Sequence, residues 1–273
     1  TGYGGEAGEA LINHQDVAQI TFTGSVKTGK VILHAAAERA VPAVVELGGK
    51  SAAVVLPDAD INKVVNATKI GIFSQAGQIC SAMSRMIVHK SIKDEVLDQL
   101  HKLAGSLKIG AGNEEGVDLT PIISEDQLQK VENYARSGLQ SGANAVFGGK
   151  RVDRKGYFFE PTIYSDVKSD MTIAQEEIFG PFLSVIEYDD YDEAVEIAND
   201  TKYGLAAGVF TNDIDMATKT ASDLNGGQVY VNSWFTGSIA TPFGGYKQSG
   251  YSREKGQQAI KSYLQLKNVG IQL

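Results

Sequence analysis

The only cysteine of the 273-residue chain, Cys80, lies in the stretch SQAGQICSAMSR at residues 74–85. A cysteine thiolate is a natural nucleophile for a carbonyl carbon. The preceding residues Gln75, Gly77 and Gln78 suit an exposed loop, and the segment after Cys80 predicts a helix whose amino end would stabilise a thiolate. Free cysteines are also among the most buried residues of proteins, so an inert core thiol is the alternative.

A carboxylate that suits the role of a base lies at Glu46, in the stretch ELGGKS at residues 46–51. It ends an apolar run and is followed closely by Gly48 and Gly49. Open α/β sheets build their sites at the carboxyl ends of strands, and an apolar flank raises the pKa of a carboxyl group toward that of a useful base. The alternative is a solvated Glu46 in a turn between two strands.

Two further motifs combine glycine turns with groups that can contact a ligand. FTGSVKTG, residues 22–29, places Gly24 and Gly29 around a strand-to-helix turn. Such a turn can receive a cofactor, but it is weaker than a complete dinucleotide fingerprint. EEIFGPF, residues 176–182, combines two acids, aromatic residues and a Gly-Pro turn, with a surface loop as its alternative. The four histidines do not have the spacing of a base partner or a metal site, so we expect them to be structural or surface residues.

These motifs lie in a chain that alternates predicted strands and helices, which indicates an α/β protein with a largely parallel sheet. The predicted strands cover residues 17–23, 41–47, 51–56, 84–89, 145–147, 183–187, 206–210 and 228–232. The predicted helices cover residues 26–39, 61–73, 92–104, 125–138, 191–200 and 216–224. The last stretch, from Lys261, alternates polar and apolar positions. As a terminal strand it would pair with a second subunit or with an edge strand of its own chain.

Composition excludes several functional classes. The chain has 33 acidic and 25 basic residues and a net charge of −8, so nucleic acid is not an expected partner. A single cysteine permits no internal disulfide, which fits a reducing, cytoplasmic compartment. No apolar run has the length of a membrane span, and the amino end lacks the pattern of a signal peptide. We therefore expect a soluble protein with no membrane partner.

The motifs have a more specific meaning in combination. ELGGK at 46–50, GQIC at 77–80, EEIFGP at 176–181 and PFGGYKQSG at 242–250 resemble the NAD(P)-dependent aldehyde dehydrogenase superfamily. Their order matches that superfamily, and so does the gap between the motif of Glu46 and that of the cysteine. The resemblance covers essentially the whole chain.

The resemblance implies the oxidation of a small-molecule aldehyde with NAD or NADP. Cys80 corresponds to the nucleophile, which forms a thiohemiacetal whose hydride passes to the nicotinamide and leaves a thioester. Glu46 corresponds to the base that activates the water for thioester hydrolysis. Such chemistry needs a soft nucleophile, a base and a hydride acceptor near one carbon atom. The backbone N–H of Cys80 would stabilise part of the developing oxyanion.

The resemblance also implies two sets of binding residues and no metal. For the cofactor these residues are Gly24, Ser25, Gly29, Leu47, Gln127, Glu177 and Phe179. For the aldehyde tunnel they are Ile79, Ser81, Trp234, Phe235 and Phe243. Glu177 would bind the ribose on the nicotinamide side, with Phe179 packed beside it.

The implied fold is an aldehyde dehydrogenase-like α/β fold in three parts. Residues 1–47 would be the remaining part of a Rossmann-like cofactor domain, 48–257 the catalytic domain, and 258–273 an oligomerisation strand of a homo-oligomer. Members of the superfamily begin with a segment that binds the adenosine half of the cofactor and supplies an Asn to the oxyanion hole. Nothing here matches that segment, so we expect the chain alone to be a weakly active or inactive fragment.

Two other functions remain open at this point. In a CoA-acylating semialdehyde dehydrogenase, CoA instead of water accepts the acyl group, and such enzymes generally lack the base that Glu46 represents. A non-catalytic fragment kept for assembly or binding is the other alternative. The presence of Cys80, Glu46 and Glu177 together argues against a degenerate site.

Overall fold

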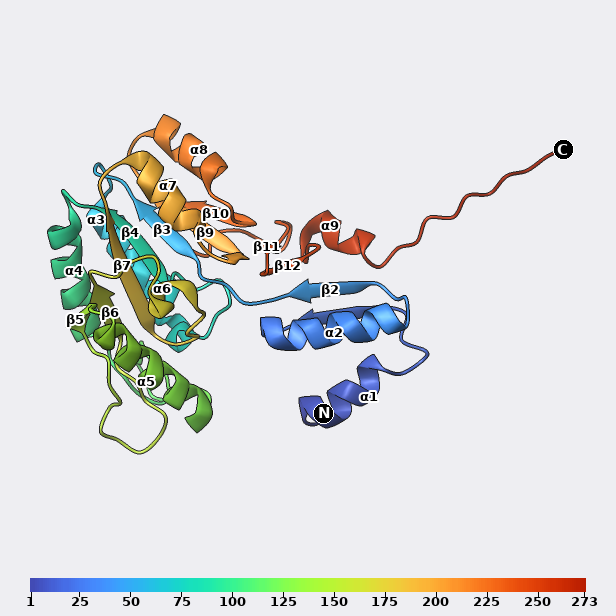
Figure 1. Ribbon diagram of the computed structural model, residues 1–273, viewed down its shortest axis with the longest axis horizontal. Coiled ribbons are helices and arrows are strands. Elements are labelled where there is room, and N and C mark those ends of the chain that lie inside the picture. The colour runs from blue at the N-terminus through green and yellow to red at the C-terminus, as the bar shows by residue number, and fades with distance from the viewer.

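The computed structural model describes residues 1–273, which form a large sheet, a small sheet and a separate two-stranded sheet, with helices packed on the large and the small sheet (Figure 1). The strands are β1 (Ile20–Thr23), β2 (Ala43–Glu46), β3 (Ala52–Val55), β4 (Arg85–His89), β5 (Asn144–Phe147), β6 (Thr162–Ser165), β7 (Phe182–Tyr188), β8 (Tyr203–Gly204), β9 (Ala206–Phe210), β10 (Gln228–Val231), β11 (Tyr246–Lys247) and β12 (Gly250–Tyr251). The α-helices are α1 (Glu9–Ile12), α2 (Val26–Glu38), α3 (Ile61–Thr68), α4 (Lys93–Ser106), α5 (Glu125–Gln140), α6 (Thr172–Gln175), α7 (Tyr191–Asn199), α8 (Ile214–Asp223) and α9 (Gly256–Lys261). Shorter helical turns span Gly4–Gly8, Lys69–Phe73 and Ser74–Gly77.

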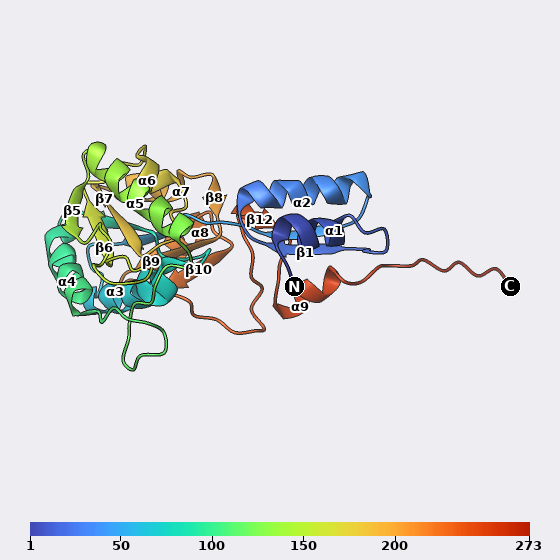
Figure 2. The ribbon, with the colours of Figure 1, turned by 90° about the horizontal axis from the view of Figure 1, so that it is seen from below.

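The large sheet has seven strands in the order β10-β9-β3-β4-β7-β6-β5. Every neighbouring pair is parallel except β5 and β6. Helices α3 and α4 lie on one face of this sheet, and α7 and α8 lie on the other (Figure 2). Central strands covered on both faces are expected to be apolar throughout, and β3 is buried at all four positions. The prediction of an α/β fold with a mostly parallel sheet is confirmed.

The small sheet consists of β1, β2 and β12, with β12 antiparallel to β2. Helix α2 packs on it through Gly29, Ile32 and Ala36, which are spaced as one face of a helix. The chain leaves this sheet at the carboxyl end of β2 and enters the large sheet at the amino end of β3. Figure 1 shows that this extended connection joins the two sheets. The strand order therefore brings the stretch ELGGKS to the boundary between them.

In several helices, the side chain of the residue directly before the first turn accepts a hydrogen bond from a backbone N–H of that turn. Ser25 caps α2, Asp60 caps α3, Ser124 caps α5 and Asp190 caps α7. Such caps stabilise a helix by about 1 kcal/mol each, because the first N–H groups of a helix have no partner within it. The cap at Ser124 determines where α5 starts, and it therefore sets the position of Gln127 in the first turn of that helix.

Two sequence predictions differ from the structure. The helix predicted after Cys80 does not form, because the amide of Met83 donates to the carbonyl of Gly71 and the chain enters β4 at Arg85. The terminal strand predicted from Lys261 also does not form within this chain. Residues 256–261 form α9, and the exposed residues after it extend away from both sheets (Figure 1). The intrachain edge strand is therefore excluded, and pairing with a second subunit remains a prediction.

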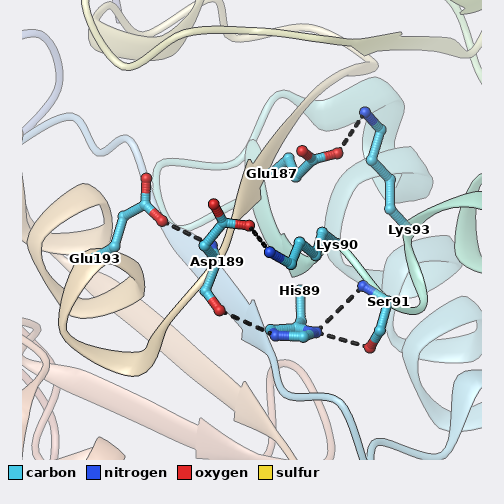
Figure 3. A network of polar contacts seen from close by, with 7 residues as sticks. All are labelled: His89, Lys90, Ser91, Lys93, Glu187, Asp189 and Glu193. Carbon is cyan, nitrogen blue, oxygen red and sulfur yellow. Dashed lines mark hydrogen bonds and ion pairs between the residues drawn. The ribbon is translucent and has the colours of Figure 1, made fainter.

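The carboxyl ends of β4 and β7 carry a polar network that involves His89 (Figure 3). The Nε2 of His89 lies 3.1 Å from the carbonyl oxygen of Asp189, and the amide of Ser91 donates to its Nδ1 at 3.2 Å. Lys90 pairs with the carboxylate of Asp189 at 2.6 Å. This network lies at the opposite end of β4 from Cys80, so His89 has a structural role.

Among the helices, none combines the length and the apolar character that crossing a membrane would require.

Candidate active site

The connection between β2 and β3 comes very close to two other segments. A Cβ at Gly48 would overlap the carboxylate of Glu177, and a Cβ at Gly49 would overlap the carbonyl oxygen of Cys80. The amide of Gly49 also donates to Glu177 Oε1 at 3.1 Å. Only glycine permits such an approach of two backbones. The glycine pair therefore brings together the motifs of Glu46, Cys80 and Glu177, which are far apart in the sequence.

Cys80 is half-buried and faces a cavity of about 560 Å³. Burial raises the pKa of its thiol, and the nearby carboxylates of Glu177 and Glu46 raise it further. The backbone N–H groups of Ser81 and Cys80 lower this pKa in part, because they stabilise the thiolate. No helix amino end contributes here, in contrast to the prediction from the sequence. The side chain lines the cavity and is therefore not enclosed in the core, and its role as the nucleophile stays a prediction.

Glu46 is the last residue of β2 and is only 1% exposed. Neither carboxylate oxygen has a hydrogen-bond partner in the protein. Burial raises its pKa to about 8, the charge of Glu254 acts in the same direction, and Arg253 opposes both. The solvated turn is therefore excluded. A carboxyl group with a pKa near neutrality can both take up and release a proton under physiological conditions.

Glu177 begins a loop that Gln127 holds in place. The side-chain amide of Gln127 donates to the carbonyls of Ile178 at 2.9 Å and Phe179 at 2.8 Å. Phe179 has a positive φ of 56°, which is an unusual conformation for an aromatic residue. The two hydrogen bonds stabilise this backbone. Burial raises the pKa of Glu177, and its hydrogen bond from Gly49 lowers it.

Two buried cations beside the site were not identified from the sequence. Lys50 is 1% exposed, and burial lowers its pKa to about 7. Arg85 donates to the carbonyl of Lys50 at 3.0 Å and to the carbonyls of Ile197 and Ala198 at the end of α7. A cation is favourable at the carboxyl end of a helix. Arg85 thus anchors the connection of Glu46 to the large sheet. The only signal for these two cations in the sequence is their position: Lys50 directly follows the two glycines, and Arg85 lies shortly after Cys80.

The cavity at Cys80 is formed by the loop that contains the cysteine and by the segment after β10. Four of the five residues predicted for the aldehyde tunnel line it, namely Ile79, Ser81, Phe235 and Phe243. The fifth, Trp234, is buried in the core behind the cavity. Residues that the sequence did not indicate also line the cavity: Gln75, Gln228, Tyr230, Thr236 and Lys255.

Comparison with known proteins gives a consistent result. A sequence model of the Aldehyde dehydrogenase family matches residues 1–269. The mitochondrial aldehyde dehydrogenase of Leishmania tarentolae is 44% identical over 269 residues, which is 98% of this chain and 54% of that protein. The chain belongs to the aldehyde dehydrogenase family.

Solved aldehyde dehydrogenases share the fold. An indole-3-acetaldehyde dehydrogenase in complex with NAD+ superimposes with a TM-score of 0.97 and 40% identity, over 100% of this chain and 56% of that one. An NAD+ complex of a Bacillus cereus aldehyde dehydrogenase has a TM-score of 0.94 and 44% identity, over 96% and 53% of the two chains. The chain spans about half the length of the relatives it matches.

In this member of the family, the other residues predicted to bind the cofactor lie on or beside the small sheet. The amide of Gly24 donates to the carbonyl of Glu46 at 3.0 Å, and Ser25 caps α2. Gly29 packs on the side chain of Leu47. These contacts connect the turn at the start of α2 to the residue pair Glu46–Leu47. Their role in cofactor binding stays a prediction.

The raised pKa of Glu46 makes stability depend on pH. Because the unfolded chain ionises at the ordinary carboxyl pKa of 4.5 and the folded chain at about 8, stability falls as the pH rises between these values. Glu46→Gln removes this dependence. We expect the variant to gain stability relative to the native chain across that interval, by up to roughly 5 kcal/mol at 1.36 kcal/mol per pKa unit. Denaturant unfolding over a series of pH values measures it.

The matched control is Glu38→Gln, an exposed position on α2, which should leave the pH dependence of unfolding unchanged. A buried amide at residue 46 adds a cost that does not vary with pH, so the slope is the decisive quantity. Equal slopes for the native chain and Glu46→Gln would show that the folded and unfolded pKa values of Glu46 are the same.

After burial, the carboxylate of Glu177 has the largest effect on the pKa of the Cys80 thiol, so it should lower the reactivity of Cys80. Since its charge raises the pKa of the thiol, Glu177→Gln is expected to shift the pH profile of Cys80 alkylation by iodoacetamide toward lower pH. Mass spectrometry measures the rate, and the single cysteine makes the label specific. Glu187→Gln, at the other end of the large sheet, is the control. If the pH profile of alkylation is the same in Glu177→Gln as in the native chain, the charge of Glu177 does not affect the thiol and this prediction is wrong.

Proposed function

We propose that the chain carries the catalytic centre of an NAD(P)-dependent aldehyde dehydrogenase that oxidises an aldehyde to a carboxylic acid. The proposal rests on one observation: a thiol and a carboxyl group lie near each other at the boundary between the large and the small sheet. A thiol faces a cavity large enough for a small aldehyde, and a buried carboxyl group with a pKa of about 8 lies close enough to raise the pKa of that thiol. This combination serves acyl transfer through a thioester.

The proposal places a dinucleotide cofactor on the side of the small sheet. A cavity of about 920 Å³ lies against α1, β1 and α2, next to the turn that contains Gly24 and Ser25, although Gly24, Ser25, Gly29 and Leu47 do not themselves line it. Its size is in the range of small-molecule sites. Gly24, Ser25, Gly29 and Leu47 would hold the cofactor on this side, and Gln127, Glu177 and Phe179 on the side of the large sheet. When bound, the cofactor supplies the hydride acceptor that converts the thiohemiacetal into a thioester.

The chain's own residues account for the other steps. The thiolate of Cys80, which the N–H groups of Cys80 and Ser81 stabilise, attacks the aldehyde carbon. The negative charge passes from sulfur to the carbonyl oxygen, where the N–H of Cys80 would stabilise it. Ile79, Ser81, Phe235 and Phe243 enclose the substrate. Ionised Glu46 removes a proton from a water molecule, whose oxygen then attacks the thioester carbon. The carboxylic acid leaves, and the thiol of Cys80 is restored.

The division of the chain into 1–47, 48–257 and 258–273 is part of this proposal. The exposed apolar residues of the last segment would join a sheet of a neighbouring subunit in a homo-oligomer: Tyr263, Leu264, Leu266, Val269 and Ile271. The single cysteine fits a reducing compartment such as the cytoplasm. The chain alone should be weakly active, because loss of one oxyanion donor slows acyl transfer by about 10²- to 10³-fold.

An activated ester tests the acyl chemistry of this chain without a cofactor. p-Nitrophenyl acetate should acylate Cys80 and form the same class of thioester. We expect Cys80→Ala to abolish this acylation and Glu46→Gln to slow deacylation by about 10²- to 10⁴-fold, the range of general-base catalysis. In the native chain, deacylation should rise with pH through the pKa of Glu46 at about 8. Intact-mass spectrometry follows the acyl-enzyme.

The same assay separates the alternatives. CoA that accelerates deacylation much more than a simple thiol would favour the CoA-acylating function. An intact, folded chain whose Cys80 does not react with the ester would favour the assembly or binding function. Unchanged deacylation in Glu46→Gln would remove the carboxylate from the mechanism.

Oxidation itself is tested by NADH formation from NAD and an aliphatic aldehyde. We expect feeble or no turnover by the 273-residue chain, and protection of Cys80 from iodoacetamide by the aldehyde. Cys80→Ala is the blank for turnover. Robust NADH production would contradict the fragment hypothesis, and absence of aldehyde protection would contradict the assignment of the nucleophile.

A further inference from the structure

Trp234 is the only tryptophan of the chain, and it lies behind the candidate active site. It is 4% exposed and does not line the cavity at Cys80. Its indole N–H donates to the carbonyl of Ser81 at 3.0 Å. Ser81 is the residue directly after the cysteine and is itself 3% exposed. The one polar atom of Trp234 therefore contacts the backbone beside the nucleophile.

The backbone and the aromatic side chains around Trp234 hold its ring in one orientation. Its ring packs directly over the backbone at Gly71 and Gly208, where a Cβ would come within about 3 Å of the indole. Tyr230 packs against it with ring centroids 5.2 Å apart, and Phe235 meets it edge-on at 6.4 Å. Aromatic contacts of this kind are worth about 0.5–1.5 kcal/mol beyond burial. The packing thus fixes the direction in which the indole N–H points.

The backbone on both sides of Trp234 has an unusual conformation. Asn232 and Phe235 have positive φ angles of 53° and 57°. Asn232 tolerates this region, and its side chain makes two hydrogen bonds with the backbone of Thr211. Phe235 does not tolerate it well, and such a residue costs of order 1–3 kcal/mol unless its surroundings stabilise it. The segment after β10 therefore holds a strained shape that presents Trp234 to Ser81.

We propose that Trp234 is a positioning residue for the nucleophile: its indole N–H holds the peptide group between Ser81 and Ala82, and this fixes the orientation of the adjacent peptide group, between Cys80 and Ser81, whose N–H stabilises the sulfur of Cys80. The rest of the loop agrees with this role, because the amide of Met83 is fixed separately by the carbonyl of Gly71 at 2.9 Å. Trp234 and Gly71 together hold the chain on the carboxyl side of the cysteine. The proposal deepens the proposed function, since it concerns the same thiol.

Trp234→Phe tests the proposal, because it removes the donor and keeps an aromatic ring in the core. The loosened Ser81 backbone should stabilise the thiolate less well. We expect iodoacetamide alkylation of Cys80 at neutral pH to slow by about 3- to 10-fold, the effect of losing one hydrogen bond, and the whole pH profile to move to higher pH. Mass spectrometry measures this rate without any turnover.

Leu100→Ala is the matched control for loss of packing. Leu100 is fully buried on α4, in the same core but away from the cysteine, and its truncation should lower the free energy of unfolding by about 2–5 kcal/mol. We expect this variant to keep the native pH profile of alkylation. If Trp234→Phe also keeps that profile while losing stability, Trp234 is only a packing residue and the proposal is wrong.

Tryptophan fluorescence gives an independent readout, since all the emission comes from one residue. Alkylation of Cys80 should change the emission of Trp234 in the native chain and in Leu100→Ala, and unchanged emission would count against the coupling. Failure of the proposed function would appear differently. The activated ester would then leave the native Cys80 unacylated, while the comparison of alkylation profiles would still decide the role of Trp234.

Discussion

Close approach of three chain segments at Gly48 and Gly49 is the constraint on which the site depends. A side chain at either position would displace the carboxylate of Glu177 or the backbone of Cys80. The same closeness removes water from the groups around it. The electrostatic properties of the site follow from that exclusion, because an ionised group that loses its hydration is stable only when another charge or a hydrogen bond replaces the water. Burial is accordingly the largest cause of the pKa shifts of Glu46, Cys80 and Lys50.

Such a site weakens the fold that contains it. Glu46 has two unpartnered carboxylate oxygens, and Lys50 has an unpartnered ammonium group. Each buried polar group without a partner costs about 1–3 kcal/mol. The continuous core of 46 residues around the large sheet supplies the compensating stability, and Arg85 fixes the connection to the end of α7. Part of the stability cost falls on Glu46, the group to which the proposed reaction assigns the role of base, and such a cost is common at functional sites.

The sequence was informative where local pattern and tertiary structure agree. Long amphipathic helices and apolar strands of the large sheet were predicted with small errors in their ends. β6 was missed, because its four residues TIYS are too few to show a period, and their complete burial depends on β5 and β7. The helix after Cys80 was predicted wrongly, because the hydrogen bond from Met83 to Gly71 spans twelve positions and overrides local preference. The resemblance assigns Trp234 to the aldehyde tunnel, but the packing of the segment after β10 buries it behind the cavity.

The position of the candidate site relative to the two sheets explains why a chain of about half the relatives' length contains both Glu46 and Cys80. Parallel sheets usually bind ligands at the carboxyl ends of their strands. The large sheet does not follow this pattern: Cys80 precedes the amino end of β4, while the network of His89 occupies the carboxyl end. The small sheet does follow it, because Glu46 ends β2. One continuous segment, from β2 through β3 to β4, therefore carries Glu46 out of one sheet and Cys80 into the other. The geometry of the pair depends on contacts within this segment and with Glu177.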